Sequence, residues 1–146
     1  MAHDNNGPNL ERSGAPYLAQ LYGYLAGAVG FDAIGMHYYL DQGGVGLDPE
    51  HMQRYVNFLQ RVMIEHDDAR APVPVYVTEC GWTQPGCALD LQAQNVASAL
   101  RVFRNNNFIQ VAANFELRDN LAAGTYYGLY QGDWTPKPAR DTFASA

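Results

Sequence analysis

The sequence has few charged residues and no long apolar run, and each shortage argues against a class of protein. Charged residues make up 16% of the 146 residues, and the formal net charge is -6. With no basic run, nucleic acid or an anionic membrane surface is disfavoured as the main partner.

No apolar stretch approaches the roughly 20 residues of a membrane span. The start, MAHDNNGPNLERSG, lacks the apolar segment of a secretion signal. This fits a cytoplasmic protein and equally a mature or truncated one, so the compartment stays open.

Cysteine is also scarce, because the chain has only Cys80 and Cys87, in a loop rich in glycine and proline. A disulfide between them would hold this loop, and the spacing allows it. Two free thiols in a reducing compartment are the favoured interpretation. A structural zinc site needs more ligands than this pair offers, and no cluster of His, Cys and carboxylates has ligand spacing. We therefore expect neither a metal nor a cofactor.

What is present is the composition of one globular domain. Hydrophobic residues make up 47% of a chain long enough for a sizeable core. No linker, low-complexity segment or internal repeat divides it. We predict a single domain over residues 1–146, with a polar start over 1–14 that is expected to be flexible.

Hydrophobic periodicity predicts alternating helices and strands. The expected helices begin at Pro16, at Pro49 after an Asp48 N-cap, near Asp90 and after Pro138. The expected strands cover residues 31–40, 71–79 and 108–117, with a short aromatic strand in the tail before a turn at Gly132. Alternation of this kind predicts right-handed β-α-β units and a parallel sheet. Three strands fit either a small open sheet or part of a (β/α)8 barrel, which takes about 250 residues.

Polar residues gather at the carboxyl end of each predicted strand, where ligands bind in parallel α/β folds. The strand ends read MHYY, TECGW and ANFELRDN. His37 and Tyr39 are two residues apart and should project to one side, with Tyr38 pointing into the helices. A hydroxyl from Tyr39 could then donate to Glu79 and hold an ionised carboxylate in one orientation. Each group also has a structural interpretation, such as a core histidine or an Arg118–Asp119 ion pair.

Three motifs in order, FDAIGMHYY, PVYVTECGW and FELRDN…YYGLY…TPKPARDTF, resemble the last part of the clan A glycoside hydrolases. The resemblance covers roughly residues 15 to 146 and implies a cellulase- or xylosidase-like (β/α)8 barrel. It implies that Glu79 matches the catalytic nucleophile and that His37 and Tyr39 match an H-x-Y motif that contacts sugar. Carbohydrate is the implied partner, and the expected substrate-binding residues are His37, Tyr39, Trp82, Asn114, Glu116 and Arg118.

The chain also departs from that family. Retaining hydrolysis uses two carboxyl groups about 5–5.5 Å apart, and the family's acid/base glutamate usually follows an asparagine on the fourth strand. No Asn-Glu pair occurs in this chain, and the first five strands have no counterpart. The tryptophan usual at the end of the last strand is replaced by Asn114-Phe115.

We therefore predict a partial, half TIM-type (β/α) barrel with parallel strands, completed by oligomerisation, most simply as a homodimer. A second copy could supply the missing acid, with Glu116 the nearest candidate. Strand alternation predicts that Ala33 and Val77 face the barrel interior. The alternatives are a non-catalytic carbohydrate-binding or structural half-barrel, and a fragment of a longer gene that is inactive alone.

Overall fold

The computed structural model describes residues 14–25, 31–39, 49–66, 72–83 and 88–145. Its elements are α1 (Gly14–Leu25), β1 (Ile34–Tyr39), α2 (Pro49–His66), β2 (Val75–Gly81), α3 (Leu89–Arg104), β3 (Ile109–Asn114) and α4 (Pro138–Ser145). The polar start over residues 1–13, Asp48 and Cys87 lie outside the described residues. Within the described ranges, no helix has the length and hydropathy needed to cross a membrane.

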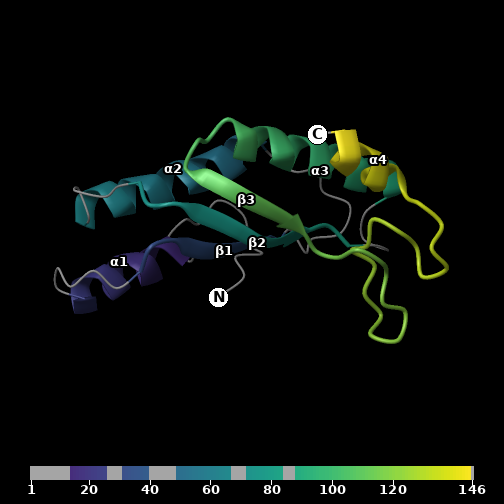
Figure 1. The fold of residues 1–146 in the computed structure, drawn as a ribbon, viewed down its shortest axis with the longest axis horizontal. Coiled ribbons are helices and arrows are strands. Elements are labelled where there is room, and N and C mark those ends of the chain that lie inside the picture. Colours follow the sequence, from purple (N-terminus) through teal and green to yellow (C-terminus); the bar gives the residue numbers. More distant parts are fainter. Residues whose placement is uncertain (1–13, 26–30, 40–48, 67–71, 84–87, 146) are drawn as a thin grey trace.

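The three strands form one parallel sheet in the order β1-β2-β3. Figure 1 shows α2, α3 and α4 on one side of this sheet, while α1 lies beside β1. Neighbouring helices contact each other in chain order, from α1 to α4. The described part of the chain places no helix on the other side, which we call the open face. This arrangement confirms the predicted parallel α/β sheet and matches part of a (β/α) barrel.

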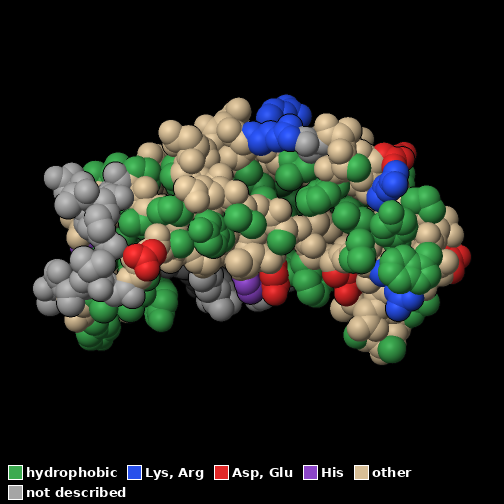
Figure 2. Space-filling view, in the orientation of Figure 1, with side chains coloured by type: hydrophobic (Ala, Val, Ile, Leu, Met, Phe, Trp, Pro, Cys, Tyr) green, Lys and Arg blue, Asp and Glu red, His purple; other side chains and the backbone are tan. Residues whose placement is uncertain are grey.

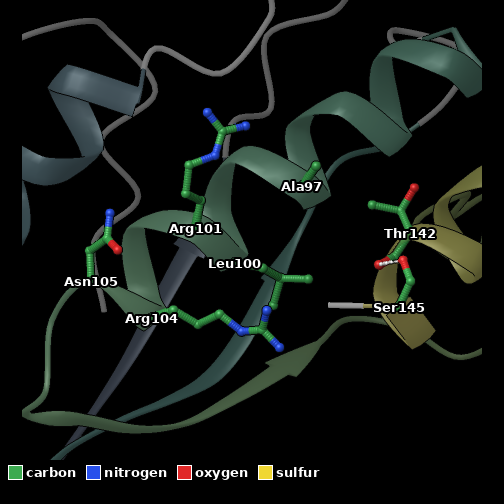
Figure 3. Close-up of a pocket in the computed structure, with 7 residues that line it drawn as sticks. All are labelled: Ala97, Leu100, Arg101, Arg104, Asn105, Thr142 and Ser145. Carbon is green, nitrogen blue, oxygen red and sulfur yellow. Dashed lines mark hydrogen bonds between the residues drawn. The ribbon is translucent and has the colours of Figure 1, made fainter.

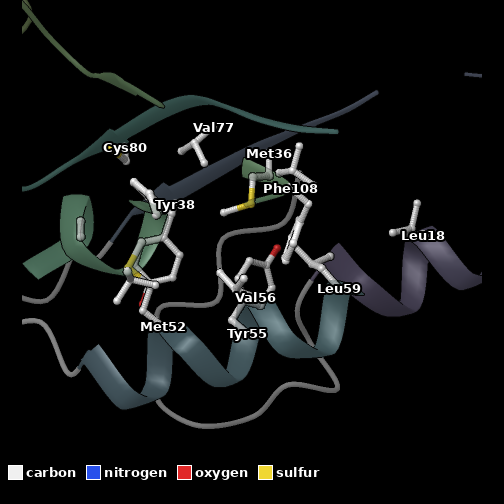
Figure 4. Close-up of a cluster of buried hydrophobic side chains, with 14 of the residues drawn as sticks. Leu18, Met36, Tyr38, Met52, Tyr55, Val56, Leu59, Val77, Cys80 and Phe108 are labelled. Atoms are coloured by element: carbon white, nitrogen blue, oxygen red, sulfur yellow. The ribbon is translucent and has the colours of Figure 1, made fainter. Parts of the chain in front are cut away.

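The hydrophobic core lies between the sheet and the helices, as Figure 4 shows for β1, β2 and α2. The face of α2 predicted from its periodicity is buried at every position: Met52, Tyr55, Val56, Leu59, Val62 and Met63. From β1, Met36 and Tyr38 point into the same cluster, and the ring of Tyr38 lies 6.1 Å from that of Tyr55. Burial of each such side chain contributes about 1.5–3 kcal/mol, so this cluster holds the sheet to its helical layer.

The tail differs from the prediction, because the expected short aromatic strand does not form. Residues 118–136 make only isolated bridges, Arg118 with Tyr130, Asn120 with Thr125 and Tyr130 with Pro136. Leu129 and Tyr130 donate to the backbone carbonyls of Glu116 and Leu117, but one residue earlier a side chain takes the place of a strand partner. The backbone N–H of Gly128 donates to the Asp119 carboxylate, 2.8 Å away. The closing helix after Pro138 is present as predicted.

The predicted interior position of Val77 is wrong, because a bulge in β2 reverses the alternation of its side chains. Met36 pairs with Val77 and His37 pairs with Glu79, so Thr78 is an extra residue without a register partner. Val77 therefore lies in the core, fully buried, while Glu79 reaches the open face. Ala33 precedes β1, is half-buried and lines an apolar pocket with Tyr17 of α1.

Neighbouring positions in β2 test this register. Val77→Asp places a carboxylate in the core and should abolish the cooperative thermal transition, because an unpaired buried charge costs several kcal/mol. Tyr76→Asp, at a side chain that is 38% exposed, should keep its secondary structure and a cooperative transition. Circular dichroism melting curves measure both. A Val77→Asp variant that melts like the parent would contradict the register.

Candidate active site

Three polar side chains meet on the open face near the carboxyl ends of β1 and β2. The hydroxyl of Tyr39 donates to Oε2 of Glu79 over 2.5 Å, and Nδ1 of His37 lies 3.5 Å from the same oxygen. The side chains of His37 and Glu79 are 40% and 37% exposed, so solvent reaches them. Figure 2 shows a histidine surface adjoining an acidic surface along the lower margin of the molecule. The predicted contact between Tyr39 and Glu79 is present.

The local register brings these groups together. Within β1 the buried residues Met36 and Tyr38 alternate with His37 and Tyr39, which project to the open face. The bulge at Thr78 then places Glu79 directly beside His37 in the neighbouring strand. Burial, reinforced by the hydrogen bond to Glu79, raises the pKa of Tyr39 well above its ordinary value. Tyr39 therefore stays protonated at physiological pH and acts only as a donor to the carboxylate.

Two aromatic residues that the sequence interpretation did not assign to the site contact Tyr39. The ring of Phe115 lies 5.9 Å from that of Tyr39, and the ring of Tyr127 lies 5.6 Å from it. Both contacts are edge-to-face, as is the contact between Phe115 and Tyr127. The YYG triplet was a visible signal for Tyr127, but its proximity to β1 depends on a tail that only the tertiary structure places.

Asn114 ends β3 and Glu116 follows it, at the same end of the sheet. Thr125 donates its hydroxyl to Oε1 of Glu116 over 2.9 Å, and the Asn114 amide donates to the Glu116 carbonyl over 3.3 Å. Both residues are partly buried. The Glu116 carboxylate is thus held by its own segment.

The expected role of Trp82 requires correction, and so does the alternative Arg118–Asp119 ion pair. The ring of Trp82 is 2% exposed and packs in the core, so it offers no flat surface to a sugar. The Trp82 ring is buried because β2 continues through Gly81 and so places Trp82 above the core. Arg118 lies over the ring of Trp134, with 4.7 Å between the guanidinium carbon and the ring centroid. Asp119 forms its ion pair with Lys137 instead of Arg118.

Cys80 and Gly81 have structural explanations. Cys80 is a free, buried thiol, and burial raises its pKa to about 12, so it is neither bridged nor a nucleophile at neutral pH. At Gly81 an added Cβ would lie 2.2 Å from the carbonyl oxygen of Phe115. Only glycine permits this close approach of β2 to the chain after β3.

A second hollow lies on the helical side, between α3 and α4, and Figure 3 shows its lining. Its volume is about 380 Å³, and Arg101 and Arg104 point to different sides of it. The hydroxyls of Thr142 and Ser145 already donate to the carbonyls of Pro138 and Thr142. These groups do not converge on one ligand. Across the described ranges, no group of three His, Cys, Asp or Glu side chains could hold a metal ion.

Comparison with known proteins places the chain by its fold. No protein-family model matches the sequence, and a search of curated proteins finds no significant match. Among solved structures, xylanase 10B from Thermotoga maritima matches 88% of this chain with a TM-score of 0.64 and 15% identity. An endo-β-1,3-glucanase of family GH128 from Amycolatopsis mediterranei matches 89% with a TM-score of 0.66 and 20% identity. A β-glucuronidase from Ruminococcus gnavus matches 78% with a TM-score of 0.59 and 21% identity.

The chain spans only part of each of these proteins: 40% of the xylanase, 51% of the glucanase and 22% of the glucuronidase. The glucanase has also been solved with laminaripentaose, and a related xylanase with xylobiose. At these identities the likeness establishes the fold. The resemblance to (β/α)8-barrel glycoside hydrolases seen in the sequence is thus matched in three dimensions, and the chain has the fold of part of such a barrel.

Proposed function

We propose that this chain is a glycosidase-type half-barrel in which Glu79 attacks the anomeric carbon of a sugar. The observation that carries the proposal is the short contact between the Tyr39 hydroxyl and Glu79 on the open face, with His37 beside it. A hydroxyl and an imidazole at one carboxylate oxygen fix its orientation, as a nucleophilic carboxylate requires. The same position in the fold is where parallel barrels place their catalytic groups.

The contacts to Glu79 leave one oxygen for chemistry. Among the described residues, both Tyr39 and His37 contact Oε2, so Oε1 is the atom available for attack. Oε1 would form a bond to the anomeric carbon while the bond from that carbon to the leaving oxygen breaks. Water would then attack the same carbon as its bond to Oε1 breaks, which releases the sugar and the free carboxylate, and the proton of the attacking water would pass to solvent. His37 and Asn114 are proposed to bind sugar hydroxyls, and Arg118 is proposed to bind outer parts of a longer substrate.

The leaving group determines whether a second carboxyl group is needed. An alkoxide leaving group needs a proton from a general acid as the bond breaks. A nitrophenolate is stable as an anion and leaves without one. Aryl glycosides therefore test Glu79 independently of the missing acid.

We propose that a second copy of the chain covers the open face. Tyr76 and Val111 are partners across β2 and β3, and both are more than one third exposed. Exposed apolar area costs about 25 cal/mol per Å² in water, and a two-fold pair needs only one self-complementary patch. In such a pair, Glu116 of the partner subunit is the candidate general acid.

Replacement of the proposed nucleophile tests the reaction directly. Glu79→Gln should reduce hydrolysis of nitrophenyl glycosides to the rate of the buffer blank, measured by release of nitrophenolate. Glu65→Gln, at an exposed glutamate near Arg61 on α2, is the matched control and should keep the parent rate. Equal rates for Glu79→Gln and the parent would contradict the proposal. Sugar binding without turnover by the parent would favour the non-catalytic alternative.

Removal of one hydroxyl tests the orientation of Glu79. Tyr39→Phe should raise the barrier by roughly 1–2 kcal/mol, which is about a 5- to 30-fold loss in kcat/KM, because a hydrogen bond to the carboxylate is lost. The melting temperature should change little, since the ring and its packing remain. Tyr126→Phe serves as the control. An unchanged kcat/KM in Tyr39→Phe would show that this contact has no part in turnover.

The mass in solution tests the second copy. Light scattering should give twice the 16.1 kDa mass of one chain for the parent. Tyr76→Asp, which places a charge on the open face, should stay folded and give the mass of a single chain. A parent that is monomeric across the accessible concentration range would contradict the two-copy assembly and leave the proposed role of Glu79 untouched.

A further inference from the structure

The segment 126–128 passes beside the candidate active site and presents the ring of Tyr127 to Tyr39. The centroid of the Tyr127 ring lies 5.6 Å from that of Tyr39 and 5.6 Å from that of Phe115. Both contacts have edge-to-face geometry. The Tyr39 ring also meets the ring of His37, with 6.4 Å between centroids and 89° between planes. The partly buried phenol ring that donates to Glu79 thus contacts three neighbouring rings.

A buried ion pair holds this segment. Lys137 is the chain's only lysine, and its ammonium group lies 2.7 Å from Oδ1 of Asp119 with both side chains buried. The same ammonium donates to the Tyr126 carbonyl over 3.1 Å, and the same Asp119 oxygen accepts from the N–H of Gly128. A Cβ at Gly128 would lie 2.3 Å from the backbone nitrogen of Asp119, so glycine permits the approach.

A buried amide also holds this segment. Nε2 of Gln92, on α3, lies 3.3 Å from the carbonyl of Tyr127 and 3.4 Å from that of Gly128. It also donates to the carbonyl of Trp82 over 2.9 Å, three residues after Glu79. The backbone around Tyr127 is therefore tied both to the tail and to the end of β2. We call Asp119, Lys137 and Gln92 the polar clamp.

We propose that Tyr127 is a positioning residue whose ring, fixed by the polar clamp, holds Tyr39 in the orientation that donates to Glu79. The polar clamp bonds only backbone groups of this segment, so a clamp that served folding alone would not require an aromatic side chain at position 127. Here that side chain packs on the one tyrosine that bonds the carboxylate. Edge-to-face packing restricts the ring of Tyr39, and small displacements of a positioned group cost large factors in rate.

The effect of this inference on turnover rests on the proposed function, but its structural content can be measured without turnover. In protein labelled with ¹³C at the tyrosine ζ carbon, the Tyr39 signal is assigned by its loss in Tyr39→Phe. Glu79→Gln provides the reference shift for a lost hydrogen bond to a carboxylate. Tyr127→Leu should move the Tyr39 signal toward the Glu79→Gln position, whereas Tyr126→Leu should leave it in place. A Tyr39 signal unmoved by Tyr127→Leu would overturn the inference.

Kinetics provide the second readout. Tyr127→Leu should lower kcat for nitrophenyl glycosides by roughly tenfold with a smaller change in KM, and Tyr127→Phe should restore most of the loss because the ring returns. A loss that Tyr126→Leu reproduces would indicate general destabilisation and overturn the inference. If the parent shows no turnover, the proposed function fails, and the NMR shift still decides the role of Tyr127.

One further variant tests the inference even if Tyr127→Leu does not fold. Gln92→Met removes the donor to the Tyr127 carbonyl and leaves all the rings intact. It should move the Tyr39 signal in the same direction, by a smaller amount. If Tyr127→Leu does not fold and Gln92→Met leaves the Tyr39 signal unmoved, the inference is wrong.

Discussion

Helices cover one face of the three-stranded parallel sheet, and the other features of this molecule depend on that one-sided cover. A parallel sheet normally has both faces buried, so its open face becomes either an interface or the wall of a cavity. Apolar Tyr76 and Val111 share this face with polar His37 and Glu79. The candidate site and the surface that needs cover are therefore the same surface, which ties the proposed chemistry to assembly.

A single extra residue in β2 makes this combination possible. With Thr78 bulged, Val77 anchors the strand in the core on one side of the bulge and Cys80 does so on the other. Glu79 can then reach the open face although strict alternation would bury it beside Val77. Bulges of this kind re-aim side chains next to active sites. Rigid packing on both sides gives the carboxylate the fixed position that the proposed nucleophilic attack needs.

Elements with local signals could be predicted from the sequence, and features that depend on a partner could not. The apolar period of α2 and Pro49 at its start define that helix without its neighbours. The i, i+2 spacing of His37 and Tyr39 was enough to foresee their shared face. The bulge at Thr78 depends on pairing with β1, so strand alternation alone misplaced Val77. Trp82 and the tail were misjudged because tertiary contacts decide where these segments lie: Gln92 donates to the Trp82 carbonyl, and Lys137 bonds Asp119.

Covalent trapping tests the role of Glu79 most directly. A 2-deoxy-2-fluoro glycoside with a dinitrophenolate leaving group needs no general acid and gives a glycosyl-enzyme that hydrolyses slowly. Intact-mass spectrometry should show one added fluoroglycosyl unit per chain, and peptide mapping should place it on Glu79. Pre-incubation with the corresponding non-fluorinated sugar should slow formation of this adduct. An adduct on another residue, or no adduct with any of a panel of such glycosides, would contradict Glu79 as the nucleophile.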